Sequence, residues 1–151
     1  MTQQQQQQRP RRPIRPPGVK LIEGATRLVK PIFSGSVAGN STVPSVRLNW
    51  PVSGRVLAVR GWAIDPTGTL TPDAASALMS VQILRDGDRS LFSNGESSDF
   101  AACRTFSPDA CPWFILDVRV SNSQPWLVSW RNSSSSALLT ELTFALREGE
   151  D

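Results

Sequence analysis

Apolar and polar side chains alternate along several stretches of the chain after residue 45. The clearest is residues 114–120, in which one face carries Phe114, Leu116, Val118 and Val120. The intervening positions include Asp117 and Arg119. Because successive side chains of a β-strand point to opposite faces, this spacing predicts a strand with one buried face.

Less regular runs of the same kind predict further strands. They cover residues 46–50, 55–64, 77–83, 89–92, 100–106 and 126–131. Residues 137–147 also suit a helix, but we expect a strand there because the surrounding pattern is that of strands. Gly61 lies inside one run and predicts a bulge or bend, and residues 72–76 predict one helical turn.

Turn-forming residues separate these runs. Asp86-Gly87 and Asn94-Gly95 are dipeptides typical of tight hairpin turns. Seven or eight short strands joined by such turns, with no long helical pattern, predict an all-β fold. We therefore expect an antiparallel β-sandwich or jelly roll over residues 46–148.

The first 45 residues lack this pattern. Residues 2–18 read TQQQQQQRPRRPIRPPG, and such a segment buries too little surface to order alone, so we expect disorder with polyproline II character. Residues 19–33 alternate weakly, which indicates an arm strand or a short amphipathic segment that ends at Pro31. We expect an extended Pro/Arg/Gln-rich N-terminal arm over residues 1–33 and a Gly/Ser/Asn-rich linker over residues 34–45.

Charge divides the chain in a similar way. The net charge is +3, but residues 1–30 carry seven basic side chains against Glu23 alone, which gives +6. Residues 31–151 carry nine basic and twelve acidic side chains, which gives −3. Opposite charges attract over a Debye length of about 8–10 Å, so we expect the arm to reach the acidic surface of a neighbouring subunit.

Three functions suit such an arm. Residues 10–15, PRRPIR, match a ligand of SH3 domains, and the positive charge suits nucleic acid, although no aromatic residues are interleaved for base stacking. We favour a tether between subunits, because Pro lowers the cost of ordering and Gln amides bond to backbone groups. The residues expected to anchor the arm are its basic ones: Arg9, Arg11, Arg12, Arg15, Lys20, Arg27 and Lys30.

The composition excludes much catalytic chemistry. The chain has no His, which excludes Ser-His-Asp and Cys-His catalysis and every His-ligated metal site. Its two Cys cannot form a structural zinc site alone, and Asp86 and Asp88 lack the rest of a calcium loop. We expect no enzyme activity, no catalytic residues, no cofactor and no bound metal.

Two other signals concern the compartment. No apolar stretch reaches the length of a transmembrane helix, so we expect no membrane span. Gln and Pro/Arg residues occupy the place of a signal peptide's apolar region, so we expect no signal peptide. Asn40-Ser41-Thr42 and Asn132-Ser133-Ser134 fit the glycosylation sequon. We interpret both as chance matches in a Ser-rich chain.

Cys103 and Cys111 flank a short stretch that contains Pro108. The two could face each other across a hairpin and form a disulfide. Without a signal peptide, we favour reduced thiols that are buried as small hydrophobes.

Trp126 and Trp130 share one face of a predicted strand. An exposed strip of Trp side chains would suit sugar stacking. We instead expect core or subunit-interface positions, because Trp buries a large area at low entropic cost.

The plan of a Pro/Arg/Gln-rich arm on a compact β-sandwich resembles that of viral structural proteins. The resemblance implies a non-enzymatic virion protein, with a bacteriophage suggested by the bias of 14 Arg to 2 Lys. It would be a coat, capsid-cementing or other shell or tail component, made in the host cytoplasm and found in the virion. Its partners would be copies of itself or other virion proteins. The alternative is a carbohydrate- or receptor-binding module of a spike or fibre.

Overall fold

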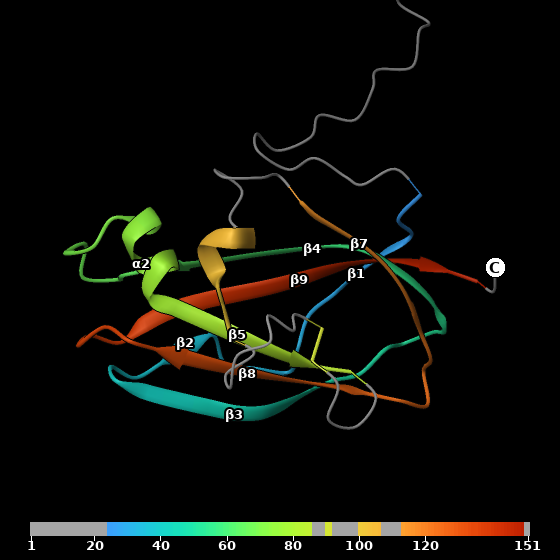
Figure 1. Ribbon diagram of the computed structural model, residues 1–151, viewed down its shortest axis with the longest axis horizontal. Helices are drawn as coiled ribbons and strands as arrows, with labels where there is room; N and C mark the ends of the chain where they lie inside the picture. The colour runs from blue at the N-terminus through green and yellow to red at the C-terminus, as the bar shows by residue number, and fades with distance from the viewer. Residues whose placement is uncertain (1–23, 86–89, 92–99, 107–112, 150–151) are drawn as a thin grey trace, which may run out of the picture.

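The computed structural model describes residues 24–85, 90–91, 100–106 and 113–149 (Figure 1). These residues form two antiparallel β-sheets around a common core, which confirms the predicted all-β sandwich. The larger sheet has five strands in the order β1-β9-β4-β7, with β2 also paired to β9. The smaller sheet has four strands in the order β3-β8-β5-β6.

The larger sheet contains β1 (Arg27–Val29), β2 (Ser36–Val37), β4 (Gly54–Ile64), β7 (Phe114–Val120) and β9 (Leu138–Glu148). The smaller sheet contains β3 (Ser41–Leu48), β5 (Met79–Leu84), β6 (Ala101–Ala102) and β8 (Trp126–Asn132). In chain order, the α-helix α2 (Pro72–Leu78) lies between β4 and β5, and the 3-10 helix η1 (Cys103–Phe106) lies between β6 and β7.

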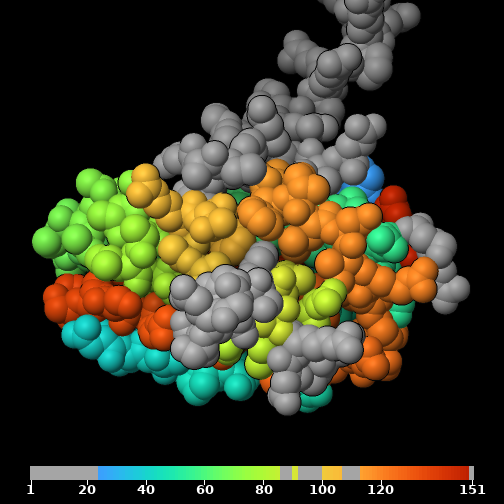
Figure 2. Space-filling model, in the orientation of Figure 1, coloured from blue at the N-terminus to red at the C-terminus, as the bar shows by residue number. Residues whose placement is uncertain are grey.

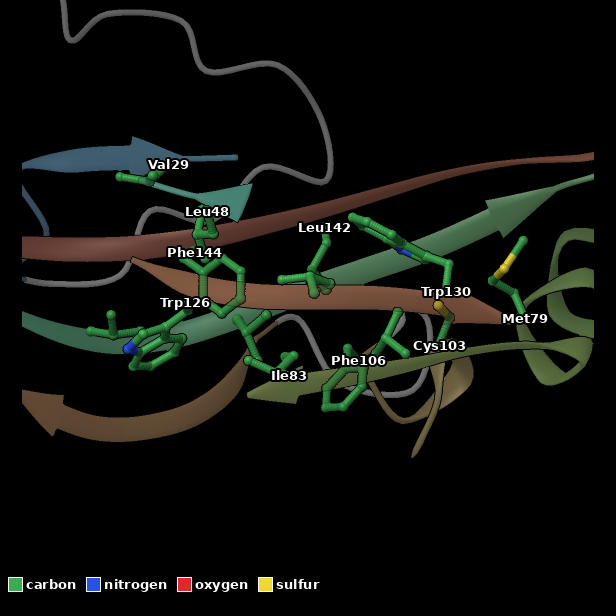
Figure 3. Close-up of a cluster of buried hydrophobic side chains, with 14 of the residues drawn as sticks. Val29, Leu48, Met79, Ile83, Cys103, Phe106, Trp126, Trp130, Leu142 and Phe144 are labelled. Atoms are coloured by element: carbon green, nitrogen blue, oxygen red, sulfur yellow. The ribbon is translucent and has the colours of Figure 1, made fainter. Parts of the chain in front are cut away.

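Side chains from both sheets meet in one hydrophobic core (Figure 3). Trp126 of β8 and Phe144 of β9 lie edge to face with ring centroids 6.0 Å apart. Trp50 stands at right angles to both, 4.9 Å from Trp126 and 5.6 Å from Phe144. Edge-to-face geometry brings the positive ring edge to a negative ring face, so these three rings join the two sheets by direct contact.

Residues 138–148 form a strand, as expected for this ambiguous segment. β9 pairs with β4 from Gly54 opposite Glu148 to Ile64 opposite Leu139. The predicted bulge at Gly61 is wrong, because the register shift lies between Val56 and Ala58.

Gly61 serves close packing instead. It pairs regularly with Leu142. A Cβ at Gly61 would lie 3.0 Å from Leu142 Cδ1 and 3.6 Å from Phe106 Cβ. The absence of a side chain therefore lets η1 approach β4.

The sandwich begins before residue 46, so the predicted linker over residues 34–45 is wrong. β2 pairs with β9, and β3 pairs with β8 from Ser41 onward. Phe33 stacks on Trp130 with ring centroids 4.2 Å apart. Gly35 and Asn40 suggested a linker, but both have positive φ angles, of 89° and 52°, and serve the turns that connect these strands.

Residues 24–33 likewise belong to the body. β1 pairs with β9, and Thr26 N–H donates to Leu146 O at 2.8 Å. The predicted arm therefore ends before Gly24 rather than at residue 33. Residues 1–23 lie outside the described part of the chain.

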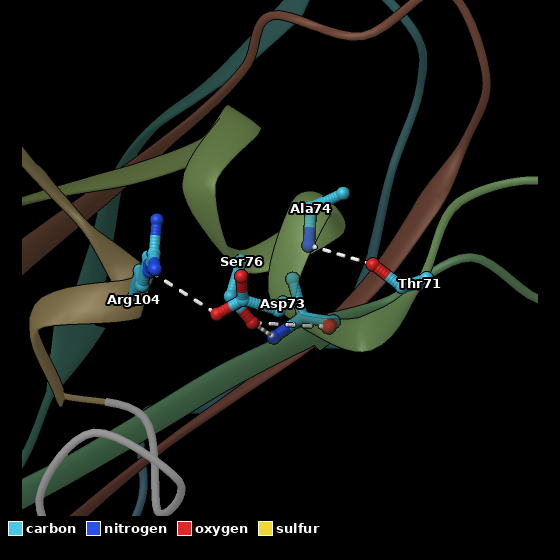
Figure 4. Close-up of polar contacts among 6 residues, drawn as sticks. Thr71, Asp73, Ala74, Ser76 and Arg104 are labelled. Atoms are coloured by element: carbon cyan, nitrogen blue, oxygen red, sulfur yellow. Dashed lines mark hydrogen bonds and ion pairs between the residues drawn. The ribbon is translucent and has the colours of Figure 1, made fainter.

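The predicted helical turn at residues 72–76 is confirmed and extends to Leu78 as α2 (Figure 4). Thr71 caps it, since its hydroxyl accepts a hydrogen bond from Ala74 N at 3.2 Å. Ser76 Oγ accepts from Ala63 N at 3.0 Å and donates to Ala63 O at 3.2 Å, which fixes the helix to β4. Asp73 pairs with Arg104 of η1 at 3.1 Å.

Two predicted strands are shorter than expected. Ala77 belongs to α2, so the strand predicted over residues 77–83 begins at Met79. The strand predicted over residues 100–106 is limited to Ala101–Ala102, because the chain turns into η1 to bury Cys103 and Phe106. Leu84 and Ser90 form an antiparallel bridge, while the turns predicted at Asp86-Gly87 and Asn94-Gly95 lie outside the described residues.

The side chain of Asn132, at the end of β8, is the centre of a buried network of hydrogen bonds. Its amide nitrogen donates to the carbonyl oxygens of Val37, Ala38 and Ser136 at 3.0, 3.2 and 2.8 Å. Its Oδ1 accepts from the backbone N and the hydroxyl of Ser134 at 2.9 and 2.7 Å. One side chain thus supplies hydrogen bonds to backbone groups of β2 and of the β8–β9 turn, and its own polar atoms are all bonded. An amide nitrogen bonded in this way is not available for glycosylation.

Replacing Asn132 by Ala should lower the free energy of unfolding by about 2–4 kcal/mol, because buried carbonyl groups would lose their donor. Chemical denaturation monitored by Trp fluorescence measures this. Asn49→Ala is the matched control, since Asn49 is exposed, and should change stability by less than about 0.5 kcal/mol. Equal effects of the two substitutions would contradict the role assigned to Asn132.

Candidate interaction surface

The outward face of the larger sheet carries a row of three arginines on neighbouring strands. Arg55 of β4 lies opposite Arg119 of β7 and also opposite Arg147 of β9. Like charges in such positions repel, and Asp117 offsets them by accepting a hydrogen bond from Arg55 Nε at 2.7 Å. That hydrogen bond, with the charges of Arg55 and Arg147, holds the pKa of Asp117 below its usual value.

A groove of about 200 Å³ lies on the same sheet. Trp62, Trp113 and Leu28 provide apolar walls, and Arg60, Lys30 and Glu141 provide charge. Lys30 Nζ lies 2.7 Å from Glu141 Oε1, so these two charges offset each other. Arg60 is half-buried and forms no hydrogen bond or ion pair with the described residues. The groove therefore combines a flat apolar surface with a guanidinium that can donate hydrogen bonds to an anionic group.

The edges of the two sheets differ in how they are protected. β3 contains Pro44 and a register shift, and Ser45 within it has a φ angle of 52°. β1, β2 and β6 have only 3, 2 and 2 residues. Prolines, bulges and short strands are the usual means of blocking unwanted strand pairing.

β7 has a register shift against β4 between Val56 and Ala58, but it has neither a proline nor a very short length to protect it. It has seven residues, none of them Pro, and among the described strands it pairs with β4 alone. Ile115 on its outward face is 68% exposed. The residues around β7, in orange, lie at the molecular surface beside the gold residues of η1 (Figure 2), where Phe106 contacts Phe114 edge to face at 5.3 Å. A strand that lacks a second partner among the described strands offers a row of backbone donors and acceptors to another chain.

Two predicted arm anchors bind the body of their own chain. Arg27 lies 3.5 Å from Glu148, and Lys30 pairs with Glu141. All four side chains of these ion pairs are partly exposed, so the role of Arg27 and Lys30 as contacts to neighbouring subunits stays a prediction. The remaining predicted anchors lie outside the described residues: Arg9, Arg11, Arg12, Arg15 and Lys20.

Trp126 and Trp130 are core residues, only 2% and 1% exposed. They are not available to a partner or a sugar, so the prediction that they are interface or glycan-binding aromatics is wrong. The alternative prediction, that they are core residues, is confirmed. Trp62 is the only one of the five tryptophans that is not buried. Trp62 and the pair Val59 and Ala63 lie on opposite faces of β4, because side chains alternate along a strand. This alternation was the signal that could have identified Trp62 as the exposed tryptophan.

Cys103 is buried and its thiol is free, 4.0 Å from Thr140 Oγ1. Burial raises the pKa of this thiol to about 12. Cys111, its proposed disulfide partner, lies outside the described residues, as do Asp86 and Asp88.

The described body is basic rather than acidic. It carries ten Arg and Lys side chains against five Asp and Glu, a net charge of +5. Seven of the twelve acidic residues after position 30 lie outside the described ranges: Asp86, Asp88, Glu96, Asp99, Asp109, Glu150 and Asp151. The acidic surface expected to attract the arm is therefore not located on the two sheets.

The structure adds little chemistry beyond this surface. Within the described ranges, no three His, Cys, Asp or Glu side chains gather to hold a metal ion. Asp65 is buried in a loop, where hydrogen bonds from Thr67 and from the backbone of Leu70 lower its pKa. None of the helices in the described part of the chain is both long and apolar enough to cross a membrane.

Comparison with protein-family models, with curated proteins and with solved structures gives no match to this chain. The outward face of the larger sheet, with its groove and with the β7 edge that has no second partner among the described strands, is therefore interpreted from its own geometry and charge.

A buried Cys103 should resist thiol reagents in the folded protein. In a Cys111→Ser variant, Cys103 is the only thiol. At pH 8, burial and a pKa of about 12 keep this thiol protonated and covered, so labelling should be at least about a hundredfold slower than in denaturant. Rapid labelling of the native variant would show that Cys103 is accessible, contrary to its position in the core.

Proposed function

We propose that the protein is a non-enzymatic structural subunit that builds an assembly by binding copies of itself. The observation that carries this proposal is the proline-free β7 edge at one side of the larger sheet, which pairs with β4 alone among the described strands. At the opposite side of the same sheet is β1, which begins at Arg27, three residues after the described chain begins at Gly24. A subunit with one contact at each side can join more than one neighbour.

The assembly that best suits this plan is a virion, in which the protein would be a coat, cement or other shell or tail component. The support is the likeness of a Pro/Arg/Gln-rich N-terminal segment on a β-sandwich to viral structural proteins. The proposal places the protein in a virus particle, of a bacteriophage in particular, after synthesis in the host cytoplasm. Its partners are other copies or other virion proteins.

A second candidate function is sugar binding at the groove. Trp62 offers a partly exposed ring, and Arg60 offers a half-buried guanidinium without a partner among the described residues. These groups suit the flat face and the carboxylate of an acidic sugar better than a neutral one. This role does not depend on Trp126 or Trp130, which are buried.

Removing residues 1–23 should leave a folded protein and abolish the larger assemblies of the full chain. The cut falls before Gly24 because β1 and Phe33 belong to the body. Circular dichroism reports folding, and light scattering reports mass. A truncated protein that assembles like the full chain would show that residues 1–23 are not a tether.

The length of the deletion is its own control. Removing residues 1–33 also deletes β1 and the stacking of Phe33 on Trp130. This longer deletion should lower the free energy of unfolding by about 3 kcal/mol or more, a cost typical of losing a buried aromatic side chain. Arm binding to nucleic acid instead of protein would appear as DNA or RNA binding that weakens steeply with salt.

The sugar-binding alternative predicts that glucuronate changes Trp fluorescence while glucose does not. Trp62→Phe should remove the signal, and Arg60→Gln should weaken glucuronate binding about tenfold or more, because it removes a charge-assisted hydrogen bond. Trp126 and Trp130 still fluoresce in both variants and report correct folding. No response to glucuronate at millimolar concentration would exclude this function.

A further inference from the structure

We infer that β7 pairs with β7 of a second copy across a two-fold axis, in the register that places Asp117 opposite the partner's Arg119. The inference rests on the proposed function and specifies one of its contacts. In this arrangement Val118 lies on the axis opposite the partner's Val118. The two larger sheets then join into one continuous antiparallel sheet.

The backbone of β7 is suited to a second strand. Its partner on one side is β4, from Gly54 opposite Val120 to Val59 opposite Phe114, with a register shift between Val56 and Ala58. On its other side no described strand pairs with it. An antiparallel partner can be an identical strand, because a two-fold axis between two copies makes their directions opposite.

The faces of β7 limit the possible registers. Phe114, Leu116, Val118 and Val120 are half-buried or buried, whereas Ile115, Asp117 and Arg119 are exposed. Residues opposite each other in an antiparallel pair point to the same face. Shifting the pairing by one residue would therefore set apolar positions against charged ones, so alternate registers are excluded.

Charge selects among the registers that remain. One of them places Asp117 opposite the partner's Asp117, and another places Arg119 opposite the partner's Arg119, which repel. The register between them places Asp117 opposite the partner's Arg119 and repeats this pair by symmetry. Both side chains are exposed on the outward face.

The existing contact of Asp117 is compatible with this pairing. Asp117 accepts a hydrogen bond from Arg55 Nε, yet its side chain is 69% exposed. A carboxylate has about four lone-pair sites and can accept from two guanidinium groups. On the inward face the same register sets Leu116 against the partner's Val120, so half-buried apolar side chains of both copies become covered.

Charge exchange in the full chain tests the register. Asp117→Arg places four cations at the contact, and Arg119→Asp places four anions there, so each variant alone should weaken self-association about tenfold or more. Mixing the two variants should restore it, because each then supplies the charge that the other needs. The double variant D117R/R119D should also associate within about threefold of the natural chain.

Sedimentation at several protein concentrations measures these affinities. Arg47→Asp is the matched control: it makes the same change of charge on β3, the edge of the other sheet, and Arg47 is exposed. It should leave self-association unchanged. Circular dichroism establishes that each variant is folded.

A cross-link provides a measurement that does not depend on charge. In a background with Cys103→Ser and Cys111→Ser, Val118→Cys should form a disulfide between two copies, because the same residue meets itself on the axis. Leu116→Cys is the matched control and should cross-link far less, since it faces the partner's Val120.

The outcomes separate this inference from the proposed function. Restoration on mixing together with the Val118→Cys cross-link supports the β7 contact. Self-association that is unchanged by the charge exchange and gives no cross-link would overturn the β7 contact. Assembly would then use other surfaces. A full chain that is monomeric at all concentrations would overturn both.

Discussion

The pairing of β4 with β9 is the interaction on which the rest of the sandwich depends. These are the two longest strands, with 11 residues each, and they pair along nearly their whole length. Every other strand of the larger sheet is attached to one of them: β1 and β2 to β9, and β7 to β4. β9 also supplies Phe144 and Leu142 to the core, so the same strand organises both the backbone pairing and the contact with the smaller sheet.

The outer parts of the larger sheet are attached by different means. On the β1 side, side chains reinforce the short strands, through the stacking of Phe33 on Trp130 and the hydrogen bonds of Asn132 to Val37 and Ala38. On the β7 side, the described contact is a ladder to β4 that has a register shift between Val56 and Ala58, with the Arg55–Asp117 pair above it. The first side is reinforced by side chains of its own chain, whereas the second has no further partner among the described strands.

Much of the fold could be predicted from the sequence because alternation is a local property. The two faces of residues 114–120 follow directly from their order, and the helical turn predicted at residues 72–76 forms as the start of α2. The error at residues 34–45 has a physical cause. β2 is only two residues long, and the start of β3 mixes Ser, Thr and Pro, so neither shows alternation, and both are stabilised by long-range partners.

The candidate surface was less predictable because it depends on strand order. Arg55, Arg119 and Arg147 are far apart in sequence, and only the pairing of three strands brings them into one row. The same holds for the edge position of β7, which no periodicity encodes. The burial of Trp126 and Trp130, and the partial exposure of Trp62, required knowledge of which face of each strand meets the other sheet.

The net charges of +6 and −3 that first suggested an attraction between arm and body need a different interpretation. The described body is itself positive, at +5, so the basic N-terminal residues gain nothing from its sheets by charge alone. A two-fold contact between identical strands is saturated when two copies have joined. Growth beyond a pair therefore requires a second, different contact, and the N-terminal segment, which joins the body beside β1 at the other side of the sheet, is in a position to provide it. On this argument the arm need not be attracted to the sheets at all, and seven of the twelve acidic residues after position 30 lie outside the described ranges.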